Sequence, residues 1–149
     1  MRKTLLLSLF MISSSVSAGR LELTDSILHV GDNYMASWDA PTPVGKNIEL
    51  DFELSPKPDN YIILSFDAYQ VSPSTNGLHG NHIYINNQFY AKFTDPNNVS
   101  ENEWKPYSFV IDRRYFNKGS NIITIEAKNA TGTTDVDDFM IRNIVLYIQ

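Results

Sequence analysis

The stretch Asn47-Ile48-Glu49-Leu50-Asp51-Phe52-Glu53-Leu54 alternates between polar and apolar residues over its whole length. Successive side chains of a β-strand point to opposite faces, so the four apolar residues share one face and the amide and carboxylate groups share the other. A strand with one apolar face and one charged face is typical of an antiparallel sheet that covers a core on one side and meets water on the other. The stretch therefore predicts a strand of a β-rich protein.

The rest of the chain supplies further strands and almost no helix. Residues 60–71 carry apolar side chains on both faces, which predicts a central strand. In residues 104–112 the side chains of Tyr107, Phe109 and Ile111 are expected to face inward. Asn86-Asn87 separates residues 83–85 from 89–93 and predicts a hairpin, because Asn tolerates the positive φ of a two-residue turn. The other expected elements are strands over residues 21–24, 27–30, 33–38, 121–128 and 139–148, and one helical turn within 113–118.

Eight or nine short strands between Pro, Gly, Asn and Asp turns are typical of a sandwich or a barrel. The chain has 149 residues, of which 42% are hydrophobic and 19% charged. That composition can bury a core, which argues against disorder, and the length argues against a multidomain enzyme. No repeat or low-complexity linker divides the chain. We expect an all-β fold with one domain over residues 19–149.

The first eighteen residues are expected to be a signal peptide. Arg2 and Lys3 precede the apolar run Leu5 to Ile12, and Val16-Ser17-Ala18 supplies small residues for cleavage after Ala18. A buried N-terminal helix is the alternative, and the run is too short to span a bilayer. We therefore expect a secreted or periplasmic protein. Since the chain has no cysteine, an exported domain of this sequence must be stabilised without disulfides.

The charge of the chain argues against binding to nucleic acid. The formal net charge is −5, and removal of the leader with its two basic residues makes it −7. Nucleic-acid and anionic-membrane binding proteins carry basic surfaces, which this composition does not supply. No segment after Ala18 is apolar and long enough to span a membrane.

Five segments of the sequence follow one another in a recognisable order of strand and turn types. They are residues 62–69, residues 81–87, Trp104 with 107–111, residues 118–127 with a Gly-Ser-Asn turn, and residues 137–146 with an acidic pair. This order resembles the galactose-binding-like jelly rolls that serve as carbohydrate-binding modules and accessory domains in secreted bacterial proteins. The resemblance implies an antiparallel β-sandwich of jelly-roll type that binds carbohydrate.

Sugar binding requires an aromatic ring against the apolar side of a pyranose and polar groups for its hydroxyls. Residues of these types gather in three long loops, 72–81, 94–104 and 129–138. We expect these loops to converge on one rim of the sandwich. The predicted ligand-binding residues are Asn76, His79, Asn81, Tyr84, Asp95, Asn97 and Trp104. An alternative platform on a sheet face would use Tyr69, Tyr84 and Tyr90, although strand aromatics more often pack within the protein.

Three carboxylates lie close together before the last strand. Asp135, Asp137 and Asp138 fall within four residues and follow Thr133 and Thr134. Calcium prefers several hard oxygen ligands, so this loop predicts a structural calcium site. The alternative is an acidic turn that is simply solvated.

The sequence lacks the usual motifs of catalysis. It has no cysteine nucleophile, no Gly-x-Ser-x-Gly elbow and no glycine-rich phosphate loop, and His79 and His82 lack a zinc-binding frame. We therefore expect a secreted, non-catalytic module for carbohydrate or cell-surface glycan. One alternative is a protein-interaction module, such as an adhesin, an envelope subunit or a secreted effector. The other is a small secreted glycan hydrolase that uses a carboxylate pair.

Overall fold

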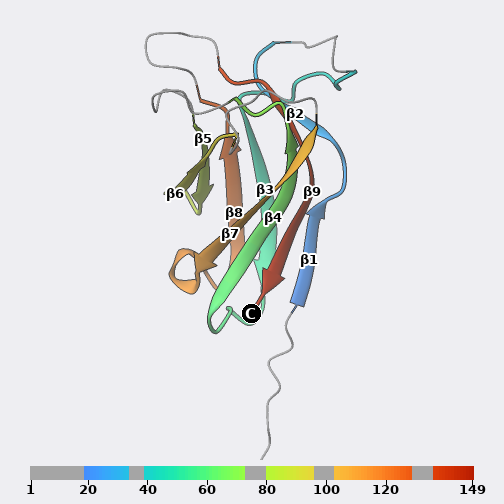
Figure 1. The fold of residues 1–149 in the computed structure, drawn as a ribbon. Helices are drawn as coiled ribbons and strands as arrows, with labels where there is room; N and C mark the ends of the chain where they lie inside the picture. The colour runs from blue at the N-terminus through green and yellow to red at the C-terminus, as the bar shows by residue number, and fades with distance from the viewer. Residues whose placement is uncertain (1–18, 34–38, 73–79, 96–102, 129–135) are drawn as a thin grey trace, which may run out of the picture.

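A computed structural model describes residues 19–33, 39–72, 80–95, 103–128 and 136–149 of the chain. Nine strands and one short 3₁₀ turn lie in this described part (Figure 1). The strands are β1 (Gly19–Thr24), β2 (Leu28–Val30), β3 (Asn47–Leu54), β4 (Tyr61–Tyr69), β5 (Asn81–Ile85), β6 (Gln88–Phe93), β7 (Trp104–Asp112), β8 (Gly119–Glu126) and β9 (Phe139–Ile148). The 3₁₀ turn, η2, spans Arg113–Tyr115.

The strands form two antiparallel sheets that pack face to face (Figure 1). One sheet has the order β1-β9-β4-β7, with β2 also paired to β9, and is called the β4 sheet below. The other has the order β3-β8-β5-β6 and is called the β8 sheet. Apart from the β5–β6 hairpin, the chain from β2 onward changes sheet at each new strand, which is the connectivity of a jelly roll. The expected antiparallel jelly-roll sandwich is confirmed.

The segments that predicted the fold occupy the positions expected of them. In β3, Ile48, Phe52 and Leu54 are buried, whereas the polar residues between them face outward. Strand β4 is central, between β9 and β7. The hairpin turn has φ of 51° at Asn86 and 64° at Asn87, as a two-residue turn of this kind requires.

Two expected elements differ from the structure. Asn33 lies outside any strand, and residues 34–38 are outside the described part. The helical turn expected within 113–118 ends at Tyr115. Its start is held by the Asp112 carboxylate, which accepts a hydrogen bond from the backbone N–H of Arg114. It ends because Phe116 has an extended backbone and buries its ring against Phe52, with 6.2 Å between ring centroids.

Aromatic rings join the two sheets at the centre of the core. Phe66 of β4 is 1% exposed, and its ring centroid lies 5.4 Å from that of Phe93 in the β8 sheet. The same ring stacks on Tyr107 at 5.5 Å and on Phe109 at 5.9 Å, both from β7. Phe93 also contacts Phe139 of β9 edge to face. Each such pair adds to the free energy gained by burying the ring area alone.

The described residues contain no helix long and apolar enough to cross a membrane.

Replacement of Phe66 by alanine tests the central position of this ring. We expect Phe66→Ala to lower the free energy of unfolding by about 3–5 kcal/mol, because it leaves a cavity between the sheets. The matched control is Val110→Ala on the same sheet, where the side chain is 61% exposed and we expect a loss of about 0.5 kcal/mol or less. Denaturant unfolding measures both. Equal losses for the two variants would contradict the assignment.

Candidate functional site

The outward side chains of the β8 sheet form two rows that cross all four of its strands. The strand register places the members of each row directly opposite one another. The first row is Asn47, Glu126, His82 and Lys92, and the second is Glu49, Thr124, Tyr84 and Phe89. The aromatic side chains therefore lie on β5 and β6, and the carboxylates lie on β3 and β8.

A shallow hollow lies on this face of the sheet. It encloses about 270 Å³ and is lined by Asn47, Glu49, Tyr84, Asn87, Thr124 and Glu126. One tyrosine ring is thus surrounded by two carboxylates, two amides and a hydroxyl. Small-ligand sites combine apolar or aromatic surface with a few placed polar groups in this way.

An aromatic cluster borders the hollow on the β6 side. The Phe89 ring is 49% exposed and meets the Tyr84 ring edge to face, with centroids 5.9 Å apart. The His82 ring lies 5.1 Å from Phe89, and its Nδ1 is 3.1 Å from the Tyr84 hydroxyl oxygen. Phe89 is held by ring contacts on one side, so its exposed area is available to a ligand.

Burial and neighbouring charges shift the pKa values of Tyr84 and His82 in the directions that favour their uncharged forms. Burial and a hydrogen bond with Glu126 raise the pKa of Tyr84. Burial, with the positive charges of Lys128 and Lys92, lowers the pKa of His82. Lys128 Nζ donates to Glu126 Oε1 at 2.6 Å. The hollow can therefore offer the neutral hydroxyl of Tyr84 beside two carboxylates, with the His82 imidazole next to that hydroxyl.

Trp104 lies on the opposite face of the molecule, at the edge of the β4 sheet. Its ring packs against that of Tyr69, 5.6 Å away, and the guanidinium carbon of Arg142 lies 4.1 Å from its centroid. Arg142 and Asn143 follow one another at a bulge opposite Asp67, and Asn143 Nδ2 donates to Asp67 Oδ2 at 2.8 Å. The protein itself thus occupies part of the indole surface.

The flanks of the three long loops meet at one end of the sandwich. Asp137 accepts hydrogen bonds from Ser72 Oγ at 2.7 Å and from Asn81 Nδ2 at 2.7 Å. The backbone N–H of Asp95 donates to the carbonyl of Ser72 at 3.1 Å, and that of Asp137 donates to Lys128 at 3.2 Å. The expected convergence of the loops is confirmed for these flanks. Asn81 is 1% exposed and holds Asp137 from within, so its contact with a ligand stays a prediction.

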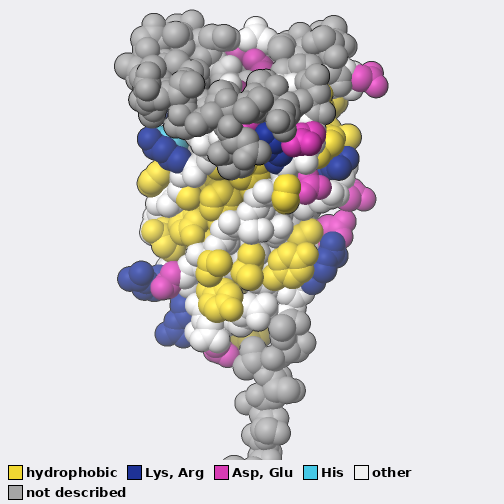
Figure 2. Space-filling view, in the orientation of Figure 1, with side chains coloured by type: hydrophobic (Ala, Val, Ile, Leu, Met, Phe, Trp, Pro, Cys, Tyr) yellow, Lys and Arg dark blue, Asp and Glu magenta, His cyan; other side chains and the backbone are white. Residues whose placement is uncertain are grey.

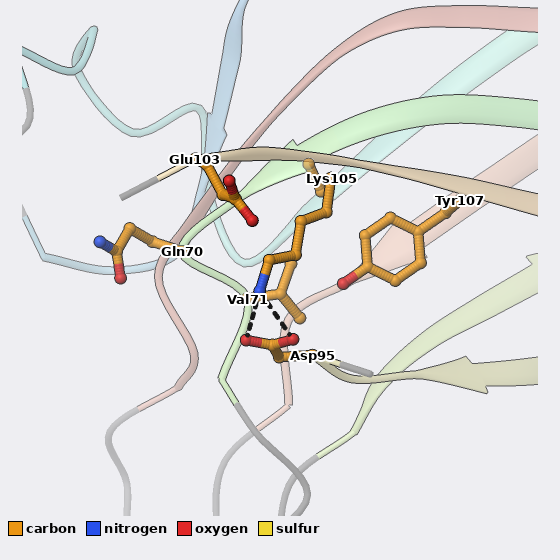
Figure 3. Close-up of a pocket in the computed structure, with 7 residues that line it drawn as sticks. Gln70, Val71, Asp95, Glu103, Lys105 and Tyr107 are labelled. Carbon is orange, nitrogen blue, oxygen red and sulfur yellow. Dashed lines mark hydrogen bonds and ion pairs between the residues drawn. The ribbon is translucent and has the colours of Figure 1, made fainter. Parts of the chain in front are cut away.

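Asp95 also forms a contact within the protein. Its two carboxylate oxygens are each 3.0 Å from Lys105 Nζ, and its side chain is 4% exposed (Figure 3). The predicted role of Asp95 in ligand binding is untested by this geometry. The other predicted residues Asn76, His79, Asn97 and Asp135 lie outside the described residues.

The two described carboxylates of the predicted calcium loop belong to different networks. Asp137 is bound by Ser72 and Asn81, as given above. Asp138 accepts hydrogen bonds from the backbone and side chain of Asn33, and its Oδ1 lies 3.3 Å from His29 Nε2. Within the described part of the chain, no three His, Cys, Asp or Glu side chains gather as metal ligands. Calcium binding therefore stays a prediction.

The idea of one platform made of Tyr69, Tyr84 and Tyr90 is wrong. Tyr69 belongs to the β4 sheet and Tyr84 to the β8 sheet, so they face opposite sides. Tyr90 instead donates its hydroxyl to the carbonyl of Val110 at 2.7 Å and bridges the two sheets.

Two patterns in the sequence also point to residues of the hollow. The outward alternation of β3 places Glu49 on the water side, and the hairpin pairs Tyr84 with Phe89. Neither pattern predicts which strand lies between β3 and β5. In the structure that strand is β8, which pairs with both.

Comparison with known proteins gives matches among solved structures alone. No family model and no curated protein matches the chain. A family 35 carbohydrate-binding module from an environmental isolate is 17% identical over 87% of this chain and 91% of that module, with a TM-score of 0.41. A family 35 module from Clostridium thermocellum is 15% identical, covers 83% and 98% of the two chains, and has a TM-score of 0.42. The family 35 module from Cellvibrio japonicus Abf62 is 12% identical, covers 87% and 97%, and has a TM-score of 0.45.

These structures are carbohydrate-binding modules of the kind that the sequence resembles. At such identities and TM-scores the similarity carries no argument about what this chain binds. The jelly-roll assignment rests on the strand order of the two sheets.

The lowered pKa of His82 predicts a pH dependence of stability. Its pKa in the folded state lies below the ordinary value of 6.5, so the unfolded chain binds a proton first as the pH falls. The contribution of His82 to the stability of the folded protein is therefore complete above pH 6.5. It is lost as the pH falls from 6.5 to the pKa of His82 in the folded state. The pKa of Asp112 is also lowered, chiefly by the Arg114 backbone N–H. Its contribution to stability is lost at more acidic pH.

Denaturant midpoints of the protein and of His82→Gln between about pH 8 and pH 5 measure this effect, because histidine titrates in that range. We expect the midpoint of the parent protein to fall by more than that of the variant. Parallel pH curves would contradict the assignment.

Proposed function

We propose that this protein is an exported, non-catalytic carbohydrate-binding module whose ligand lies on the outer face of the β8 sheet. The observation that carries the proposal is the hollow of Tyr84, Glu49 and Glu126 beside the exposed ring of Phe89. Exposed aromatic surface and hydrogen-bonding groups occur together there, which is the combination that a sugar requires.

The two kinds of group match the two kinds of surface on a pyranose. The C–H face of the sugar ring is apolar and packs on an aromatic ring, for which Phe89 and Tyr84 are available. The hydroxyls need donors and acceptors in the plane of the sugar. The carboxylates of Glu49 and Glu126 accept hydrogen bonds, and the amide of Asn47 both donates and accepts.

Hydrolysis is less well supported than binding. Glu49 and Glu126 come from neighbouring strands in diagonal register, so two carboxylates do line the hollow. Glu126, however, is held by Lys128 in an ion pair. The hollow is also shallow, whereas small-molecule sites usually bury most of their ligand in a cleft or cavity. We therefore assign the carboxylates to hydroxyl recognition.

A protein partner is the second candidate, and one observation favours it. Val110, Ile63 and Tyr147 lie in one register row across the outer face of the β4 sheet. Val110 is 61% and Tyr147 39% exposed. Figure 2 shows apolar side chains gathered over this face. An exposed apolar patch of this kind is typical of protein contacts.

A calcium ion near Asp135 to Asp138 is a further part of the proposal. Asp138 is the better placed of the two described carboxylates, because a second carboxylate is near it: Asn33 Nδ2 donates to Asp138 Oδ2 at 3.2 Å and to Asp32 Oδ1 at 3.1 Å. Oxygen donors of this type suit calcium.

Calcium at millimolar concentration should raise the melting temperature by a few degrees, because a ligand that binds the folded state stabilises it. Chelation with EDTA should reverse the shift, and Asp138→Asn should abolish it. No response to calcium or to EDTA would remove the site.

A glycan array with the protein lacking residues 1–18 tests the binding surface. We expect Phe89→Ala and Tyr84→Ala each to weaken glycan binding by about tenfold or more, as the loss of a central contact does. Trp104→Ala, an aromatic replacement on the opposite face, is the matched control and should leave binding unchanged. Reducing ends should not increase during incubation with the bound glycan.

Other outcomes would contradict parts of the proposal. Loss of binding in Trp104→Ala alone would move the site to the β4 sheet. Release of reducing ends would identify a hydrolase. If no glycan binds the folded protein, the protein-interaction function takes its place.

A further inference from the structure

Lys105 and Asp95 form an enclosed pair that joins the two sheets. Lys105 is the second residue of β7 in the β4 sheet, and Asp95 follows the end of β6 in the β8 sheet. Their side chains are 11% and 4% exposed. Lys105 Nζ lies 3.0 Å from each carboxylate oxygen of Asp95. The nitrogen therefore lies at the same distance from both oxygens of the carboxyl group (Figure 3).

Apolar and polar side chains together surround the pair. Ala68 and Val71 are buried beside it, and burial together with the charge of Asp95 raises the pKa of Tyr107. The small hollow at this point is also lined by Gln70 and Glu103 (Figure 3). It encloses about 10 Å³, which is close to the space that one water molecule needs.

We propose that Lys105 and Asp95 condense spontaneously in the folded protein to an isopeptide bond, with Glu103 as the proton carrier. One proton passes from the Lys105 ammonium group to the Asp95 carboxylate, which leaves a neutral amine and a neutral acid. The amine nitrogen attacks the carboxyl carbon, and a new N–C bond forms. A second proton moves from the nitrogen to the departing hydroxyl, the C–O bond breaks, and one water leaves. Atoms and charge balance without an oxidant, a reductant or a cofactor.

Three features of the site favour the reaction. Both side chains are enclosed, which limits the access of bulk water to the pair. The two groups are held in contact, with 3.0 Å from the Lys105 nitrogen to each carboxylate oxygen, and this positioning replaces the entropy cost of a bimolecular encounter. Glu103, an exposed residue that lines the same hollow, supplies a carboxylate for taking the proton from nitrogen and giving it to the leaving hydroxyl.

The bond would give this chain the constraint that a disulfide gives other exported domains. The sequence has no cysteine. A link between residues 95 and 105 would close the connection from β6 to β7 and fasten one sheet to the other, which restricts the unfolded chain. The proposal rests on the enclosed pair and is independent of the ligand that the outer face of the β8 sheet binds.

Intact-mass spectrometry of the folded protein, denatured just before measurement, tests the proposal directly. We expect a mass lower than that of the sequence by one water molecule. A protease that cuts after glutamate separates Asp95 from Lys105 at Glu101 and Glu103. In the linked protein the two resulting peptides should remain joined and should fragment as a branched pair.

Matched variants identify the groups involved. Lys105→Arg keeps the charge but lacks the amine, so it should have the full mass of its sequence. Glu103→Gln keeps the pair and should also show the full mass or much slower loss of water. Glu53→Gln, which alters an exposed carboxylate of β3, should lose water like the parent protein.

The parent protein alone decides the outcome, because it needs no variant to fold. A folded sample with the full mass of its sequence would overturn the proposal. Loss of water without joined peptides would also overturn it, since a succinimide at another aspartate gives the same mass.

Discussion

Burial of one face of every strand between the two sheets is the constraint on which the rest of this structure depends. Phe66 and Phe93 come from different sheets and meet at the centre, and Phe139 packs against the same cluster. Because side chains alternate along a strand, fixing these rings inward also fixes which residues face outward. A register slip of one residue in β5 would bury Tyr84 and expose Ile83. The hydrophobic core therefore determines the composition of the proposed binding face.

The β8 sheet joins the core to the proposed binding face. Its inner face is apolar, and its outer face carries the polar groups of β3 and β8 beside the aromatic side chains of β5 and β6. A cysteine-free sandwich needs other connections between its layers. Here the Lys105–Asp95 pair and the hydrogen bonds of Asp137 hold the loop flanks together at one end. Support of the scaffold and recognition of a ligand thus fall to different sets of residues.

Strand pattern and turn chemistry predicted most of the fold but little of the site. The bounds of β3, β7 and β9 agree with the sequence pattern, because alternation and β-branched residues are local signals. The site depends on neighbours that are distant in sequence, such as Glu49 and Tyr84, which β8 brings to one surface. Asn81 and Asp95 have the residue types of a binding loop, yet their side chains are enclosed. Residue type alone does not distinguish a buried network from a ligand contact.

The central claim is that the outer face of the β8 sheet recognises a glycan. Backbone amide chemical shifts, followed by NMR while a glycan found on the array is added, test this most directly. We expect the shifted amides to cluster at Tyr84, Phe89 and Glu126, with those around Trp104 and Arg142 unchanged. Shifts confined to the Trp104 face would contradict it.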